Sequence, residues 1–104
     1  MTTTTAAHPQ VTFQIAADLL RWRADEHPQR TAVNVEGAAA LTFGQWELRS
    51  NAAAHRLIKH GVRPGDRVAL LFGERDWADY AVAYFGVLKT SATAVHLSTG
   101  MRVA

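Results

Sequence analysis

The chain has 104 residues, enough for one domain with its own core, and 48% of them are hydrophobic against 19% charged. Eleven Lys and Arg residues against nine Asp and Glu residues leave a formal net charge of +2, and the basic residues are scattered along the chain. This pattern argues against nucleic-acid binding, and the absence of cysteine excludes disulfides, thiolate metal sites and a cysteine nucleophile.

The first ten residues, MTTTTAAHPQ, carry neither a basic region nor an apolar core, so they do not form a signal peptide. We predict a disordered leader over residues 1–11 and one folded unit over residues 12–104. The longest apolar stretch, YAVAYFGVL at residues 80–88, is about half of what crosses a bilayer. We therefore expect no membrane partner and a cytoplasmic location.

Residues 12–27 are predicted to form a helix that ends before Pro28, since the residue preceding a proline is pushed out of the helical region. Its expected apolar side consists of Ile15, Leu19, Leu20 and Trp22. The next segment, TAVNVEGAAALTF at residues 31–43, alternates as a pair of strands that turns near Gly37.

A second helix is predicted from a capping box at Thr42 and Gln45 to about residue 60. Its apolar face has spacings of three and four residues and consists of Trp46, Ser50, Ala53, Ala54, Leu57 and Ile58. Gly61 suits the left-handed position after the helix, and Val62 can make the accompanying hydrophobic contact. The segment RPGD at residues 63–66 then forms a turn.

A strand–helix–strand unit is predicted for the remainder of the chain. The segment RVALLF at residues 67–72 is apolar without alternation, which indicates a strand covered on both faces. A helix capped by Asp76 runs to about Lys89, and residues 92–98 form a further strand. This spacing favours a right-handed βαβ unit with parallel pairing, so we expect an α/β fold with helices packed on a partly parallel sheet.

A phosphate site at Gly73 is not expected. Phosphate loops need several converging backbone N–H groups, whereas GERDWADY at residues 73–80 holds a single glycine followed by Glu74 and Asp76. These carboxylates repel an anion, and neither the P-loop nor the dinucleotide fingerprint is present. Gly73 is more simply the exit of a strand.

Two residues remain as candidates for contact with a ligand. Glu74 and His96 fall at the carboxyl ends of the predicted parallel strands, where ligands of open α/β sheets gather. For His96, a histidine hydrogen-bonded at the sheet margin is the favoured alternative. The three tryptophans lie on apolar helix faces, where core packing is favoured. We assign no catalytic residue, no cofactor-binding residue and no metal ligand.

The sequence resembles the N-terminal portion of the adenylate-forming enzymes (AMP-dependent synthetases and ligases) over about residues 12–100. The first core motif of that family appears as LTFGQW at residues 41–46, with Glu47 and Leu48 one place late. The family's turn and strand stand intact as GVRPGDRVAL at residues 61–70. The second core motif is LKTS with VHL at residues 88–91 and 95–97, so Ser91 replaces the usual glycine and His96 the usual proline.

The resemblance implies an N-terminal piece of a larger enzyme fold. Complete members activate a carboxylic acid with ATP and Mg²⁺ and then transfer the acyl group to coenzyme A or a carrier thiol. The family's phosphate loop, adenine-binding residues, magnesium-associated glutamate and C-terminal lysine come later and have no counterpart here. The resemblance thus implies a fragment or split subunit of an acyl- or aryl-CoA ligase that is not competent for catalysis alone.

Two alternatives stay open, a non-catalytic module that binds and modulates a partner enzyme, and an unrelated small α/β binding protein. An unpaired strand edge in residues 67–72 or 92–97 would favour association, with another copy or with a larger polypeptide that completes the fold. The sequence does not specify the acid substrate or the thiol acceptor.

Overall fold

The structure is a computed structural model that describes residues 9–34, 40–73 and 76–98. Its elements in chain order are α1 (Pro9–Glu26), β1 (Thr31–Asn34), β2 (Ala40–Thr42), α2 (Phe43–Lys59), β3 (Arg67–Phe72), α3 (Trp77–Lys89) and β4 (Thr93–Ser98). These elements confirm the predicted α/β architecture. The expected turn near Gly37 lies outside the described residues.

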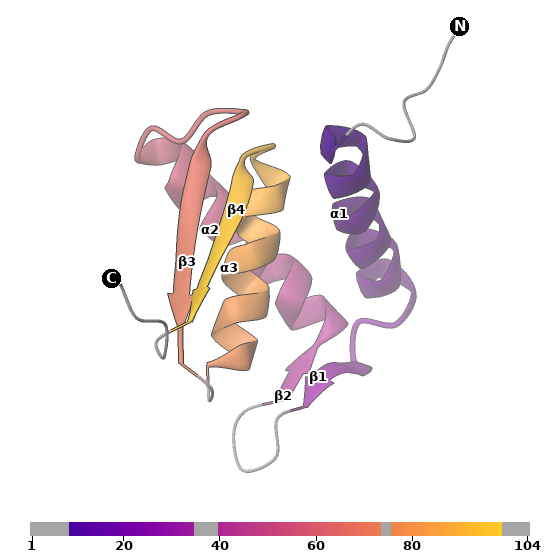
Figure 1. Cartoon of the computed structure of the whole chain (residues 1–104). Coiled ribbons are helices and arrows are strands. Elements are labelled where there is room, and N and C mark those ends of the chain that lie inside the picture. Colours follow the sequence, from indigo (N-terminus) through magenta and orange to yellow (C-terminus); the bar gives the residue numbers. More distant parts are fainter. Residues whose placement is uncertain (1–8, 35–39, 74–75, 99–104) are drawn as a thin grey trace, which may run out of the picture.

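The strands form two separate pairs (Figure 1). β1 and β2 are antiparallel, and their register shifts between Thr31 and Val33. β3 and β4 are parallel over their whole length, from Arg67 opposite Thr93 to Phe72 opposite Ser98. The parallel βαβ unit predicted from the sequence is therefore confirmed.

Helix α1 differs from the prediction in its start and in its buried face. It begins at Pro9, three residues before the predicted start at residue 12; a proline fits the first helical turn because its missing N–H has no partner there. Over residues 15–26, where side-chain burial is described, α1 buries Leu20 and Ala24, whereas Ile15, Leu19 and Trp22 are more than half exposed. The predicted apolar side was therefore wrong except at Leu20.

Helix α2 has the ends that the sequence predicts. The Thr42 hydroxyl accepts from the Gln45 amide at 3.1 Å, and the Gln45 side chain accepts from the Thr42 amide at 3.0 Å, which completes the capping box. At the other end Gly61 has φ +99°, and the amides of Gly61 and Val62 donate to the carbonyls of Ile58 and Leu57. This is a full Schellman motif, and Val62 and Leu57 both pack against the same core.

The core lies between β3–β4 and the two helices α2 and α3. Its buried members are Leu70, Val87 and Ala92, with Leu57 of α2 among the side chains packed against them. α2 and α3 approach closely at Gly86, where a Cβ would lie 2.7 Å from the Cβ of Ala53. Only a glycine fits at this crossing without a shift of one of the helices.

The described residues cover only one face of the parallel sheet. Leu70 of β3 is 5% exposed and faces α3, whereas its neighbour Leu71 on the opposite face is 59% exposed. In Figure 1, α2 and α3 lie behind β3 and β4, and no described element lies in front of them. The prediction that residues 67–72 are covered on both faces was wrong for the described residues, because α2, which precedes β3, and α3, which connects β3 to β4, pack on the same side.

Candidate functional site

The backbone that follows β3 is hydrogen-bonded to the carboxylate of Asp76. The Asp76 side chain accepts a hydrogen bond from the Gly73 amide at 3.0 Å and makes no capping bond to α3. Asp76 thus precedes α3 as predicted, but its carboxylate does not cap the helix as expected. The same bond occupies the Gly73 N–H with a carboxylate oxygen of its own chain, so this amide is not free to bind an anion. Glu74 lies outside the described residues.

His96 lies on the helix-facing side of β4 and contacts two tyrosines of α3. Its ring stacks on Tyr80 with centroids 5.5 Å apart and meets Tyr84 edge-on at 4.7 Å. The Tyr80 hydroxyl and the His96 Nδ1 are hydrogen-bonded. His96 is therefore hydrogen-bonded at the margin of the sheet, which is the alternative that the sequence favoured over contact with a ligand. The residue itself remains exposed to solvent.

Tyr80 is the centre of this aromatic cluster. Its ring also contacts Phe72 and Trp77, each with centroids 5.5 Å apart. Burial raises the pKa of Tyr80 above its ordinary value of 10.0, and the neighbouring Tyr84 phenol adds to the rise. The phenol therefore stays protonated near neutral pH and can donate its proton to Nδ1 of His96.

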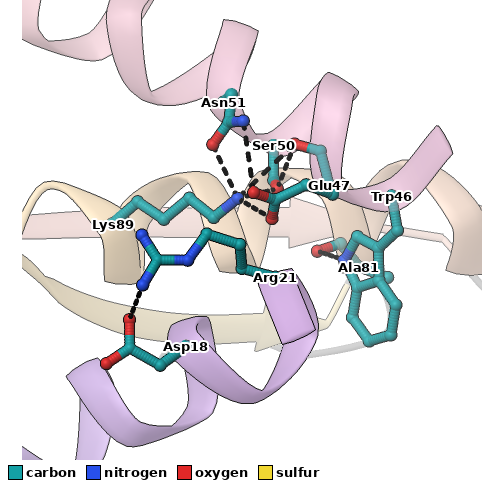
Figure 2. A network of polar contacts seen from close by, with 8 residues as sticks. All are labelled: Asp18, Arg21, Trp46, Glu47, Ser50, Asn51, Ala81 and Lys89. Carbon is teal, nitrogen blue, oxygen red and sulfur yellow. Dashed lines mark hydrogen bonds and ion pairs between the residues drawn. The ribbon is translucent and has the colours of Figure 1, made fainter. Parts of the chain in front are cut away.

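A polar network joins α2 to the C-terminal end of α3 (Figure 2). The ammonium group of Lys89 lies 2.5 Å from Oε1 of Glu47, 2.8 Å from Oγ of Ser50 and 2.7 Å from Oδ1 of Asn51. The Lys89 and Glu47 side chains are only 13% and 15% exposed. All three ammonium protons thus have an acceptor in a setting largely shielded from water.

The Lys89 network fits a structural role better than a chemical one. A lysine acts as a nucleophile or base through a free nitrogen lone pair, whereas the Lys89 nitrogen is held by hydrogen bonds to Glu47, Ser50 and Asn51. Ser50 is fully buried and donates its own proton to the Glu47 carbonyl at 3.1 Å. The network therefore fixes one helix against the other.

Sequence reasoning did not single out the Lys89–Glu47 pair, although a signal was present. Glu47 belongs to the first core motif and Lys89 to the second. Each is the charged residue of a segment that otherwise consists mostly of apolar or small residues. The two residues are 42 positions apart in the sequence, so neither helix periodicity nor strand alternation relates them.

A cavity of about 470 Å³ opens beside this network, between α1 and the ends of α2 and α3. Its lining comprises Ala17, Asp18, Arg21, Glu47, Asn51, Leu88, Lys89 and Ser91. The two basic and two acidic side chains of this lining balance, and Arg21 is paired with Asp18 at 3.2 Å. The cavity accordingly offers no net charge that would select an anion.

Of the three tryptophans, only Trp46 is placed as predicted. Its indole N–H donates to the Ala81 carbonyl at 2.8 Å, and its ring lies 4.6 Å from that of Phe85 (Figure 2 shows the hydrogen bond). Trp22 and Trp77 are 53% and 55% exposed, so the expected core packing was wrong for them. Both lie on helix faces that no described element covers.

Neither a metal site nor a membrane-spanning helix is found among the described residues. Among them, no three side chains of the types His, Asp, Glu or Cys converge to hold a metal ion. None of the described helices combines the length and the apolar character needed to span a membrane.

Comparison with known proteins identifies the family. The sequence profile of the AMP-binding enzymes matches residues 20–104. The chain belongs to this family. The match covers every element from the second half of α1 onward, so the resemblance inferred from the two core motifs is confirmed.

Individual relatives agree with the family match. A medium/long-chain fatty-acid–CoA/3-oxocholest-4-en-26-oate–CoA ligase from Mycolicibacterium smegmatis is 35% identical over 82 residues, 79% of this chain and 14% of the ligase. The nonribosomal peptide synthetase phqB from Penicillium fellutanum is 41% identical over 78 residues, 75% of this chain and 3% of the synthetase. Both acyl-CoA ligases and peptide synthetases are thus among the relatives of this chain.

The fold is shared with solved members of the family. A fatty acid AMP ligase from Legionella pneumophila superposes with a TM-score of 0.73 at 29% identity, over 84% of this chain and 15% of the ligase. The chain therefore spans about a seventh of the length of the acyl-activating ligases that it matches. Its elements correspond to the N-terminal subdomain of those adenylate-forming enzymes.

Proposed function

We propose that this AMP-binding chain is the N-terminal part, or a separately encoded subunit, of an ATP-dependent acyl- or aryl-CoA ligase. The observation that carries the proposal is the family match over residues 20–104 together with the 14% of the fatty-acid–CoA ligase that the chain covers. Acyl-activating ligases are favoured over peptide synthetases by the spacing of residues 74–89, ERDWADYAVAYFGVLK.

The reaction proposed for the complete enzyme has two steps. An oxygen of the substrate carboxylate attacks the α-phosphorus of ATP and pyrophosphate leaves, which gives an acyl-adenylate. The thiol of coenzyme A, or of a carrier, then attacks the acyl carbon and AMP leaves. ATP, Mg²⁺ and the thiol are cofactors or substrates of that complete enzyme, and we assign none of them to a side chain of this chain.

The contribution of this chain to such an enzyme is a scaffold. The Lys89–Glu47 contact at 2.5 Å and the close approach of Gly86 to Ala53 hold α2 and α3 in one arrangement behind β3 and β4. We still propose Glu74 and His96, at the carboxyl ends of the two parallel strands, as the residues of this chain that lie nearest to a ligand. An unchanged ligand affinity after His96→Ala in the completed enzyme would remove His96 from that proposal.

Catalytic competence tests the main proposal directly. The purified chain should give no exchange of labelled pyrophosphate into ATP with any carboxylic acid, while the complete M. smegmatis ligase, assayed alongside with a fatty acid, serves as the positive control. Exchange above background by the chain alone would show that it carries its own active site and would refute the proposed role.

A second candidate function is a non-catalytic module that binds a partner enzyme. It is favoured by the exposed apolar side chains Leu71, Trp22 and Leu19, each more than half accessible. Native mass spectrometry of the chain purified from its host discriminates the two functions. A companion that carries the family's phosphate loop supports a split ligase, whereas a companion enzyme that is active without the chain supports a modulator.

A further inference from the structure

The loop that follows α3 holds a backbone outlier. Ser91 has φ +64°, and among the residues that the structure describes it is the only one besides glycine with a positive φ. Its amide donates to the Leu88 carbonyl and its carbonyl accepts from the Gly65 amide, both at 3.0 Å, so neighbouring backbone holds this conformation in place. A side chain in the left-handed region costs stability, and residues held in such conformations cluster at ligand sites. The strain thus indicates a function for the serine hydroxyl.

The Ser91 side chain lines the cavity of about 470 Å³ between α1 and the ends of α2 and α3. This volume falls within the range of about 300–1,000 Å³ that is typical of sites for small molecules. The described residues place no hydrogen-bond partner on the Ser91 hydroxyl, and no buried polar side-chain atom among them lacks a partner. The hydroxyl is therefore accessible and can bind a molecule in the cavity.

The basic side chains of the cavity differ in what they can still bind. The three ammonium protons of Lys89 already have acceptors in α2. The Arg21 guanidinium has five N–H donors, of which Asp18 accepts one at 3.2 Å. Figure 2 shows Arg21 on the side of α1 that is turned toward the Lys89 network. The donors that remain for a ligand are those of Arg21 and Ser91, with one N–H of the Asn51 amide.

Two carboxylates of the same lining supply acceptors. A carboxylate has about four lone-pair sites. Asp18 uses one of them for Arg21. Glu47 binds Lys89 through Oε1 and Asn51 through Oε2, the second at 3.4 Å. Both carboxylates therefore keep lone pairs that can accept from a further donor.

We propose that this cavity binds a small zwitterion that carries an ammonium group and a carboxylate group. The carboxylate of the ligand accepts hydrogen bonds from Arg21 and Ser91, and its ammonium group donates to Asp18 and Glu47. The lining holds two basic and two acidic side chains, so a ligand without net charge is favoured. A simple anion would be repelled by the two carboxylates, and a simple cation by the two basic groups.

The cavity is separate from the carboxyl ends of the strands. Lys89 is the last residue of α3, whereas Tyr80, the partner of His96, lies near the start of that helix. At 1.5 Å per residue, the two positions are about 14 Å apart along the helix axis. The proposed site is therefore additional to any acyl-activating chemistry, and it does not depend on the proposed function.

Two zwitterions and two analogues with a single charge test the site. L-Alanine and γ-aminobutyrate differ in the separation of their charged groups, while propionate and ethylamine each keep one charged end of alanine. NMR titration of the isotope-labelled chain follows the amide resonances of residues 18–21 and 88–91. About two charge-assisted hydrogen bonds correspond to a dissociation constant on the order of 1 mM. We expect at least one zwitterion to bind in that range, and both analogues to bind about tenfold more weakly or less.

The variant Ser91→Gly separates binding from folding. It removes the hydroxyl together with the backbone strain, so it should weaken binding of the zwitterion about fivefold while it raises the urea midpoint of unfolding. Arg21→Ala should weaken binding about tenfold, because it removes the charged donor. The matched control is Arg49→Ala, at an exposed arginine of α2 that does not line the cavity, and it should leave the affinity unchanged.

Three results would overturn the inference. The first is the absence of binding by both zwitterions up to about 10 mM, tenfold above the expected dissociation constant. The second is binding of propionate or ethylamine as tight as that of L-alanine and γ-aminobutyrate, since one charge would then suffice. The third is an unchanged affinity in both Ser91→Gly and Arg21→Ala, which would place the bound molecule elsewhere on the chain.

Discussion

The ammonium group of Lys89 and the carboxylate of Glu47 lie 2.5 Å apart and join α3 to α2 across 42 positions of sequence. Both side chains are largely removed from water, and Ser50 and Asn51 bind the remaining protons of the ammonium (Figure 2). The cost of placing two charges in this interior is offset by their contact and by these additional hydrogen bonds.

Breaking the pair on one side should destabilise the chain strongly. Glu47→Gln or Lys89→Met leaves one largely buried charge without its partner, and we expect a loss of about 3–5 kcal/mol in the free energy of unfolding. Urea unfolding followed by tryptophan fluorescence measures this loss. The matched control is Arg21→Ala, which removes the exposed pair with Asp18 and should cost under about 1 kcal/mol. Equal effects of the two changes would contradict the structural role of Lys89.

Ser91 offers a change that should stabilise the chain. It has φ +64°, in the left-handed region, directly after Thr90, the C-cap residue of α3. This is the position that glycine prefers at helix ends, because a side chain is strained there by about 1–2 kcal/mol. Ser91→Gly should therefore raise the free energy of unfolding by about 1 kcal/mol.

Gly61→Ala provides the opposite test of the same physics. Gly61 has φ +99° and open space around its Cα, so alanine meets no clash and only backbone strain opposes it. We expect a loss of about 1 kcal/mol by the same denaturant measurement. A gain with Gly61→Ala, or a loss with Ser91→Gly, would show that backbone strain does not determine stability at these helix ends.

The crossing of α2 and α3 should not tolerate a methyl group at position 86. In Gly86→Ala the new Cβ would lie 2.7 Å from the Cβ of Ala53, so the helices must separate. Overpacking of this kind costs about 1–3 kcal/mol. Ala53→Gly in the same chain removes the opposing methyl group and should restore part of the loss. No difference between the single and the double variant would refute this contact.

Tyr80 should make the chain less stable at alkaline pH. Its pKa is raised in the folded state above the ordinary value of 10.0, so the folded chain holds the phenolic proton more tightly than the unfolded chain does. The associated stability is fully present below pH 10 and is lost as pH rises through the folded pKa. Tyr80→Phe should flatten the fall of unfolding free energy above pH 10 relative to the unsubstituted chain. An identical fall in both would contradict the shift.

Local signals in the sequence predicted local structure well. The capping box at Thr42 and Gln45 and the glycine at position 61 are short-range chemistry, and the structure has both as predicted. The spacing of apolar segments also predicted the parallel pairing of β3 with β4. These features depend on residues close in sequence or on a connection of ordinary length.

Features that depend on what covers a surface could not be predicted in this way. Helix α1 carries two neighbouring apolar stripes, one through Leu20 and Ala24 and one through Leu19 and Trp22, and its sequence does not state which one meets α2 and α3. Similarly, the apolar run of β3 indicates that both faces favour burial, not that the described chain covers both. The Lys89–Glu47 pair arises only when the two helices have already packed.

The uncovered face of β3 and β4 has a consequence for synthesis on the ribosome. The last strand of the parallel pair ends at Ser98, so in a relative of full length this unit can fold while most of the polypeptide is still unmade. Translation at about 5–20 residues per second leaves Leu71 and Val95 in water for an interval on the order of tens of seconds. Apolar surface exposed for such an interval is prone to aggregation, so a full-length enzyme would need its remaining segments or a chaperone to shield this face.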